Sequence, residues 1–520
     1  MGASSRVAAG ILVSRLTGLL RERVIAHYLG SQTIVADAFR AAIRIPNLLN
    51  NLFGEGVLSA SFITVYSKLR AAGEDDQAED LAAAIFGILA LLCGALVLAG
   101  IVFTPYLVDV IALGFTGERR SLTIQLARIV FPGTGLLVMS AWCLGILNSH
   151  RRFLLSYTAP VAMNCAMIAA LITFGPRTGQ SQLVLDLAWA YVVGGALQFL
   201  VQWPKVRRLL PDFRPMLDLQ SPAVRAVLRN FGPVFVSRGV VQVSATVDSM
   251  IASLLPLGAV ASLGYGQIIS ILPVSLFSMS VSAAELPALS SATGSREEIA
   301  AFLQKRLSAG LRRIAFFIVP SAVAFLILGD VLVAALYQTG RFSHADVPYV
   351  WAVLAGSSVG LLATSLGRLY SSAFYALFDT KTPLRFAVVR VILTIILGYL
   401  FALPLPRLLG IQQEWGVAGL TASAGIAGWV EFVLLRRGLR QKIGATPLSR
   451  DFLVKLWSMA IAAGVLGFSV KHLIGTVDPW ITAAVVLPIY GITYFAGTSY
   501  WQIEESQTVV ASILRRVRLR

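Results

Sequence analysis

The sequence has few charged residues and few cysteines for its length. Of its 520 residues, 13% are charged, three are cysteine and four are histidine. Cys93, Cys143 and Cys165 lie in apolar stretches without CxxC spacing, which argues against a disulfide framework and against a zinc site. No GxxxxGK[ST] phosphate loop is present, and no interval between apolar stretches is long enough for a soluble catalytic domain. We therefore expect no cofactor, no metal and no enzyme activity, including that of a membrane glycosyltransferase or phosphatase.

Hydrophobic residues, in contrast, make up 57% of the chain, and the mean hydropathy is +0.76. A soluble domain of this size would not stay in solution with that composition. The net charge of +17 comes from basic residues in short loops between apolar stretches and not from one continuous basic face, which argues against a nucleic-acid partner. Membrane lipids are the expected surroundings.

Apolar runs long enough to cross a bilayer as helices occur about fourteen times along the chain. The predicted spans lie at 7–29, 34–67, 81–111, 121–147, 154–174, 183–203, 229–255, 259–290, 311–337, 346–377, 384–404, 415–435, 453–474 and 479–501. Basic residues concentrate in alternate loops and in the tail, and the positive-inside rule makes these regions cytoplasmic. We therefore expect a multi-pass protein with both termini in the cytoplasm.

A weak internal repeat relates the two halves of the chain. GILVSRLTGL, around Arg15, is echoed by PVFVSRGVVQ, around Arg238, and the stretch around Pro46 is echoed around Pro273. Halves repeated in the same orientation would place a substrate path between them, although chance similarity of apolar helices is the alternative. The expected domains are an N-terminal lobe at 1–203, a cytoplasmic linker at 204–228, a C-terminal lobe at 229–440, and two further helices with a basic tail at 441–520.

The first two predicted helices carry ionisable residues at bilayer depth, where each costs roughly 2.5–3.5 kcal/mol on insertion scales. The residues that share a face are Arg15, Arg21 and Glu22 in the first helix and, if the second helix continues through Pro46, Asp37, Arg40, Arg44, Asn47 and Asn51. The excess of arginine predicts a cationic cavity for an anion, and the planar guanidinium suits a phosphate or pyrophosphate group. The alternative is structural pairing, such as Arg21 with Glu22 or Asp37 with Arg40.

The second half carries fewer charges in its predicted spans. Asp248, in an apolar run, is a candidate ligand for a coupling cation or a partner in a structural pair. For Arg128, Arg368, Arg390 and Glu431, packing pairs or interfacial positions are the favoured interpretation.

Several short motifs follow one another along the chain in a fixed order. SRLTGLLRERVIAHYLG, ADAF, IPNLL and LFGEGVLSASF come first, followed by RIVFPG, ILNSHRRFLLSYTAPVAMN, LPALS, TGRF and FYALFDTKTP. This series resembles the MurJ (MviN) family of flippases for lipid-linked cell-wall precursors. It spans roughly residues 4–440 and is far more specific than any one motif.

The resemblance implies an all-α integral membrane fold of the MOP-exporter type, with two six-helix lobes in a V, two additional C-terminal helices and a central cationic cavity. The implied activity is transport of lipid II, the undecaprenyl-pyrophosphate-linked peptidoglycan precursor, to the periplasmic leaflet of the bacterial inner membrane by alternating access, with H⁺ or Na⁺ as a candidate coupling ion. Two alternatives are a polysaccharide or drug exporter of the same superfamily and a non-transporting scaffold.

The resemblance also implies a set of substrate-binding positions. The family's residue types are present at Arg15, Arg21, Asp37 and Glu55. Glu22 and Arg44 are conservative replacements of the family's residues. Two positions depart, because Asn50 and Ile268 stand where the family usually has arginine. These departures leave three alternatives: the protein moves lipid II itself, it moves a related polyprenyl-linked glycan, or it holds the pyrophosphate with Arg40, one turn from Arg44, and Arg238, the repeat equivalent of Arg15.

The positive-inside pattern predicts that a reporter active only in the cytoplasm, fused after Arg520, will be active. The measurement is reporter activity in intact cells, with a fusion in the predicted periplasmic loop at Arg177 as the inactive control. Activity of a periplasmic reporter after Arg520 would overturn both the even number of spans and the repeat alignment.

Overall fold

The computed structural model describes residues 3–54, 58–290, 295–446, 448–475, 477–509 and 511. In these ranges the regular secondary structure is helical, and the only exception among the described residues is an isolated β-bridge between Thr339 and Phe342. The predicted all-α class is therefore confirmed. The chain divides into two compact units, of which the first comprises Met1–Ala261 with Thr339–Phe342 and the second comprises Ser262–Gln338 with Ser343–Arg520. The lobe boundaries expected from the sequence stay a prediction.

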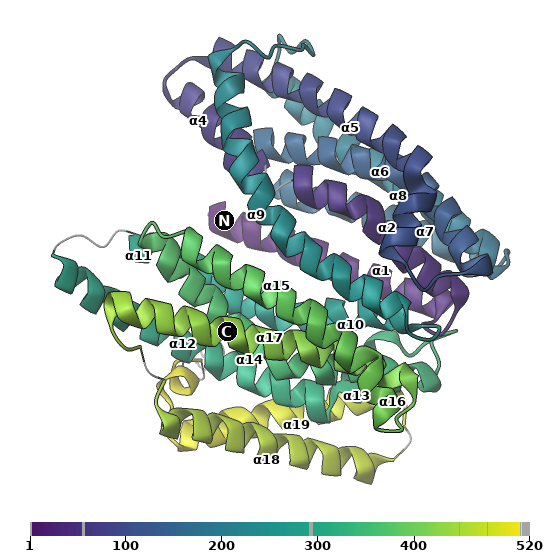
Figure 1. Ribbon diagram of the computed structural model, residues 1–520, viewed down its shortest axis with the longest axis vertical. Helices are drawn as coiled ribbons and strands as arrows, with labels where there is room; N and C mark the ends of the chain where they lie inside the picture. The colour runs from purple at the N-terminus through teal and green to yellow at the C-terminus, as the bar shows by residue number, and fades with distance from the viewer. Residues whose placement is uncertain are drawn as a thin grey trace. The chain divides into compact units, whose positions relative to one another are not determined.

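The first unit consists of long helices joined by short loops (Figure 1). Its elements are α1 (Ala3–Leu29), α2 (Ile34–Phe53), a π-helical turn (Ser59–Ile63), α4 (Thr64–Ala71), α5 (Asp75–Ile111), α6 (Gly117–Ser149), α7 (Phe153–Phe174), α8 (Gln180–Leu209) and α9 (Pro222–Ser253).

The second unit begins in the first turn of α10 and includes the C-terminal helices. Its elements are α10 (Ala259–Pro273), a π-helical turn (Val274–Met279), α11 (Ser280–Ser290), α12 (Arg296–Ile327), α13 (Gly329–Tyr337), a 3₁₀ turn (His344–Asp346), α14 (Val347–Ala376), α15 (Lys381–Ala402), α16 (Pro404–Leu408), a second 3₁₀ turn (Gln413–Trp415), α17 (Gly416–Ile443), α18 (Arg450–Ile474) and α19 (Pro479–Tyr500).

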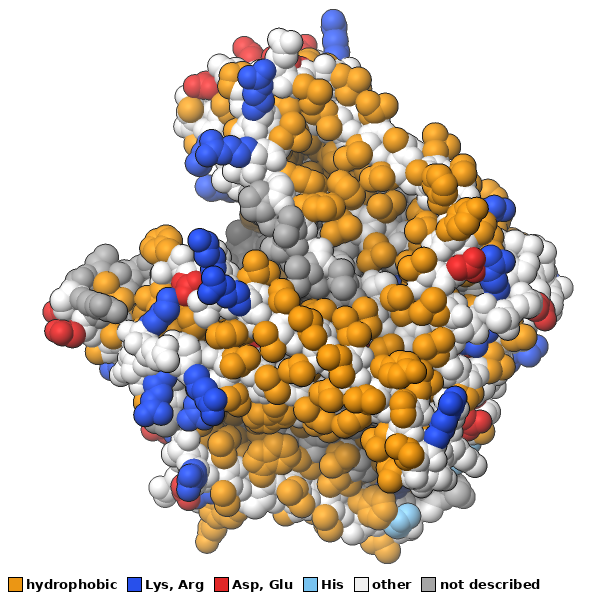
Figure 2. Space-filling view, in the orientation of Figure 1, with side chains coloured by type: hydrophobic (Ala, Val, Ile, Leu, Met, Phe, Trp, Pro, Cys, Tyr) orange, Lys and Arg blue, Asp and Glu red, His pale blue; other side chains and the backbone are white. Residues whose placement is uncertain are grey.

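The helices follow the predicted spans in order, and 11 of those described are long and apolar enough to cross a membrane. The spans that fall outside this set are α1, α2 and α9, which are the helices with the candidate site residues of the first unit. Figure 2 shows hydrophobic side chains spread over the face of α15 and α17, with Lys and Arg side chains gathered near the helix ends. This distribution is that of a protein whose helices lie in hydrocarbon and end in water.

The second predicted span, 34–67, is wrong as a continuous helix. Thr33 caps the start of α2 by accepting a hydrogen bond from the N–H of Ala36, and the helix does continue through Pro46 as the polar stripe requires. It ends at Phe53 because Gly54 leaves the helical conformation, with φ −84° and ψ −150°. The π-helical turn and α4 follow as separate elements.

Aromatic side chains fill the core at one end of the first unit. Phe86, Trp142, Trp203 and Phe213 pack against one another, with ring centroids 4.9–5.8 Å apart for the pairs of Phe86 with the other three. Trp142 is fully buried, and Phe213 reaches this core from the loop after α8. The loop that the sequence predicts as a linker is therefore anchored to the helices of this unit.

In the second unit, α14 and α17 approach closely where small residues face each other. A Cβ added at Gly360 would lie 2.2 Å from the Cα of Gly425, so neither position has room for a side chain. Helices in membranes commonly associate through such contacts, because small residues let the backbones approach and increase van der Waals packing.

Helix α19 contacts α12 at the place where a proline interrupts the hydrogen bonds of α12. Pro320 has no N–H, so the carbonyl of Phe316, four residues earlier, has no helical donor from that position. The Tyr494 hydroxyl donates to this carbonyl at 2.7 Å, and the Tyr490 hydroxyl donates to the carbonyl of Pro320 at 2.7 Å. In hydrocarbon, where water is absent, these bonds satisfy acceptors that would otherwise be costly.

The contact between α14 and α17 predicts that Gly360→Ala will destabilise the protein by about 1–3 kcal/mol, because the added methyl group must displace the backbone at Gly425. Gly367→Ala, on the same helix, is the matched control, since its Cβ would lie 3.7 Å from Leu435 in ordinary contact. Thermal unfolding in detergent measures both variants, and equal melting temperatures would contradict the prediction.

Candidate functional site

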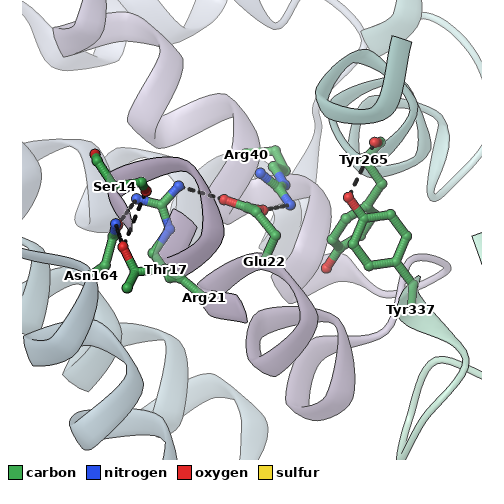
Figure 3. A network of polar contacts seen from close by, with 8 residues as sticks. All are labelled: Ser14, Thr17, Arg21, Glu22, Arg40, Asn164, Tyr265 and Tyr337. Atoms are coloured by element: carbon green, nitrogen blue, oxygen red, sulfur yellow. Dashed lines mark hydrogen bonds and ion pairs between the residues drawn. The ribbon is translucent and has the colours of Figure 1, made fainter. Parts of the chain in front are cut away.

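Glu22, in α1, lies at the centre of a charged network in the first unit (Figure 3). One carboxylate oxygen accepts from Nη2 of Arg21 at 2.6 Å, and the other accepts from Nη2 of Arg40, in α2, at 2.5 Å. The Glu22 side chain is 4% exposed, whereas those of Arg21 and Arg40 are 24% and 16% exposed. A single buried carboxylate is therefore shared by two guanidinium groups.

Arg21 is also held from the opposite side by α7. Its Nη1 donates to Oδ1 of Asn164 at 3.0 Å, and Nδ2 of Asn164 donates to the Thr17 hydroxyl at 3.0 Å (Figure 3). The guanidinium plane is thus fixed by two partners, as its fork of donors allows. Asn164 was not among the sequence-predicted site residues, although an asparagine within an apolar helix was a signal that could have identified it.

A second group of polar residues lies farther along α2. The charge of Asp248, in α9, acts on the Arg44 guanidinium, so these two groups lie close enough to compensate each other. Asn47 accepts from the Tyr191 hydroxyl at 3.0 Å, and Asn51 donates to Gln242 at 3.1 Å. The polar stripe predicted on α2 therefore contacts helices α8 and α9 within the first unit.

Asp37 lies apart from this network and has a different set of partners. Its side chain is fully buried, and Oδ2 accepts from Arg119 at 2.5 Å and from the N–H of Gly258 at 2.8 Å. Oδ1 accepts from the N–H of Ala261 at 2.7 Å. The expected alternative pair of Asp37 with Arg40 is wrong, because Arg40 bonds Glu22 and Arg119 bonds Asp37. Asp37 joins the starts of α2, α6 and α10.

The remaining candidates are not joined to these groups by any hydrogen bond that the described residues make. Arg15 is exposed on α1, and Asn50 is half-buried near the end of α2. Glu55 lies outside the described residues, as does the side chain of Arg238, whose backbone is part of α9. Ile268 is half-buried in α10 of the second unit. The substrate roles of all these residues stay predictions.

Charged residues of the second unit occur in pairs between helices. Nη1 of Arg390 lies 3.1 Å from Oε2 of Glu431, and Nε of Arg306 lies 3.1 Å from Oε2 of Glu285. Arg128, in the first unit, donates to the carbonyl of Ile101. These contacts agree with the packing role favoured from the sequence for Arg390 and Glu431.

The network around Glu22 is suited to electrostatic binding of an anion. Arg21 and Arg40 place two guanidinium groups around one buried carboxylate, and their positive charges favour an anion nearby. Nε of Arg21 is buried and has no hydrogen-bond partner among the described residues. Charge-assisted, bidentate contacts are the strongest that arginine makes with phosphate oxygens.

Glu22→Gln should destabilise the protein by about 3–5 kcal/mol, because it leaves Arg21 and Arg40 at membrane depth without their shared countercharge. Thermal unfolding in detergent gives the measurement. Glu504→Gln is the control, since Glu504 is 86% exposed and lies 3.9 Å from Arg312, and we expect no measurable shift there. Equal stability of the wild type and the Glu22 variant would refute the shared-carboxylate account.

Comparison with known proteins gives matches over nearly the whole chain. A family model described as "Lipid II flippase MurJ" matches residues 25–490. The chain is 33% identical over 444 residues to the lipid II flippase MurJ of Burkholderia cenocepacia, covering 84% of this chain and 83% of that protein. It is 27% identical over 512 residues to the probable lipid II flippase MurJ of Vibrio cholerae, covering 96% and 94% of the two chains.

Solved structures agree with these matches at the level of the fold. A lipid II flippase MurJ in an inward closed conformation aligns with a TM-score of 0.78 and 21% identity, over 95% of this chain and 98% of that chain. An inward-facing multidrug resistance transporter of the MATE family and MOP superfamily aligns with a TM-score of 0.65 and 18% identity, over 85% and 99%. The extent of the family match and the identity to curated relatives place this chain in the MurJ family of lipid II flippases.

Proposed function

We propose that this protein transports lipid II from the cytoplasmic to the periplasmic leaflet of the bacterial inner membrane for peptidoglycan synthesis. The observation that carries the proposal is the family match over residues 25–490, which includes Arg40 and Asn164 of the network around Glu22. Transport by alternating access needs no covalent chemistry, so the protein acts as a transporter and not as an enzyme.

The charge of the network supports a diphosphate-bearing substrate. Arg21 and Arg40 share the Glu22 carboxylate, and in the low dielectric expected at membrane depth a guanidinium group attracts an anion strongly. Arg40 thereby supplies a charge that compensates for Asn50, the first of the two positions where the sequence departs from the family pattern. A drug exporter would not require this excess of arginine, and the likeness to MATE transporters concerns the fold alone.

Orientation and energy coupling complete the proposal. We place both termini in the cytoplasm, with the lobes expected from the sequence moving against each other. The coupling ion is H⁺ or Na⁺, and Asp248 is the candidate ligand, since its charge acts on the Arg44 guanidinium of the polar stripe of α2. A substrate anion at Arg44 would weaken this interaction and couple the two sites.

Arg21→Ala and Arg44→Ala should each reduce lipid II transport at least about tenfold, because a lost charge-assisted contact is worth about 1.5–3 kcal/mol. Lysine at Arg21 should restore transport only in part, since one ammonium group cannot replace the fork that contacts both Glu22 and Asn164. The measurements are rescue of cells depleted of their lipid II flippase and a leaflet-specific assay of lipid II accessibility.

Arg128→Ala is the matched control, because Arg128 is an exposed arginine whose described contact is a backbone carbonyl. Protein abundance and melting temperature must stay near those of the wild type for a transport defect to be attributed to binding. Full transport in both alanine variants would leave only the structural role of these arginines.

A further inference from the structure

A cavity of about 640 Å³ lies in the first unit, away from the network around Glu22. Its walls come from the turn between α6 and α7, from the first turns of α7 and from Lys205 near the end of α8. The end of α6, the start of α7 and the end of α8 lie at the same end of the bundle. Short connections join the three helices in sequence, and α6 packs against α8. The cavity is large enough for a headgroup or part of a lipid.

The charge of this cavity is entirely basic. Arg151, Arg152 and Lys205 line it, and none of its lining residues is acidic. Within the described part of the chain, these three side chains make no ion pair. Lys442, near the end of α17, instead pairs with Asp379 at 2.6 Å, and Lys471, near the end of α18, pairs with Asp330. The cavity therefore presents uncompensated positive charge to a ligand.

The tight turn between α6 and α7 holds the two arginines in place. The N–H of Arg151 donates to the carbonyl of Asn148, and the N–H of Arg152 donates to the carbonyl of Leu147. Arg151 has φ of +57°, so the turn adopts a left-handed conformation that is uncommon outside glycine. Both side chains thus extend from a backbone already ordered before a ligand binds, which lowers the entropic cost of binding.

His150 lines the cavity without adding to its charge. Burial is the main cause that lowers the pKa of its imidazole to about 4, and the charges of Arg70 and Arg152 lower it further, against the opposing effect of Asp75. Its Nε2 lies 2.9 Å from the Tyr66 hydroxyl, which holds the ring against α4. The positive charge at neutral pH accordingly comes from the two arginines and the lysine.

Apolar side chains form the rest of the wall. Phe153 is half-buried, and Leu154 is 48% exposed on the first turn of α7. A ligand bound here would contact cations at one end and hydrocarbon at the other, which is the chemistry of a phospholipid at the membrane boundary. Basic loops lie on the cytoplasmic side in the proposed orientation, so the lipid belongs to the cytoplasmic leaflet.

We propose that this cavity binds the phosphodiester headgroup of an anionic phospholipid, with Arg151, Arg152 and Lys205 contacting the phosphate and Phe153 and Leu154 contacting the start of the acyl chains. The leaflet assignment rests on the orientation given in the proposed function, whereas binding itself does not. A lipid bound at the α6–α7 turn would anchor this end of the first unit to the cytoplasmic surface.

The test measures binding of fluorescent phosphatidylglycerol to the full-length protein in detergent. Arg151→Gln with Arg152→Gln should weaken binding at least about tenfold, because both charge-assisted contacts with the phosphate are lost. Lys205→Gln, on a different element, should weaken it several-fold and serves if the double variant fails to fold. Lys471→Gln is the matched control, since Asp330 already compensates Lys471, and binding there should stay unchanged.

Competitors distinguish the sources of the phosphate. Phosphatidylcholine, inorganic phosphate and glycerol phosphate should compete poorly, because the first lacks net charge and the others lack acyl chains. Equal competition by free phosphate would overturn the lipid assignment, and stronger competition by undecaprenyl diphosphate would make the cavity a substrate subsite instead. Unchanged binding in folded variants of Arg151, Arg152 and Lys205 would refute the site. Failed rescue of flippase-depleted cells, with lipid binding intact, would count against the proposed transport alone.

Discussion

The Glu22 carboxylate, held between Arg21 and Arg40, is the interaction on which the charged part of the first unit depends. Ionised side chains at membrane depth are costly unless they are paired, and here one acid serves two bases on two different helices. That arrangement stabilises α1 against α2 and still leaves a positive field. The same contacts therefore hold the helices and retain the capacity to bind an anion.

Other polar groups within the helices are also paired, although their partners differ from those of Glu22. Asp37 joins Arg119 and two backbone N–H groups, so three partners hold its buried carboxylate. In the second unit, Tyr494 donates to the carbonyl that Pro320 leaves without a helical donor. Such partners come from helices far apart in the chain, and they allow prolines and charges to persist inside an apolar bundle.

The ends of the helices follow a different rule, because water and lipid headgroups are present there. Basic side chains at these ends pair with acids in some loops, as Lys442 does with Asp379, whose pKa is lowered mainly by the hydrogen bond from Lys442. At the α6–α7 turn the basic side chains line a cavity instead. Basic side chains thus gather twice in the first unit, once around Glu22 and once at the α6–α7 turn.

Much of the fold follows from the sequence alone. The apolar runs indicate where most of the helices lie, and the distribution of basic loops predicts an orientation, since both are properties of short segments. The ordered motifs identify the family, and the charges of α1 and α2 mark the region of the site. Residues that share a face, such as Arg40 and Arg44, follow from helical periodicity.

Only the tertiary structure decided which charges meet. Periodicity relates residues within one helix, but it says nothing about the distance between helices, so it could not pair Asp37 with Arg119, 82 residues later. For the same reason it could not identify Asn164 as a partner of Arg21. The break in the second span depended on the backbone at Gly54, and the basic cavity depended on the packing of α7 and α8. Both arise from contacts between segments that fold against each other, which a linear pattern does not contain.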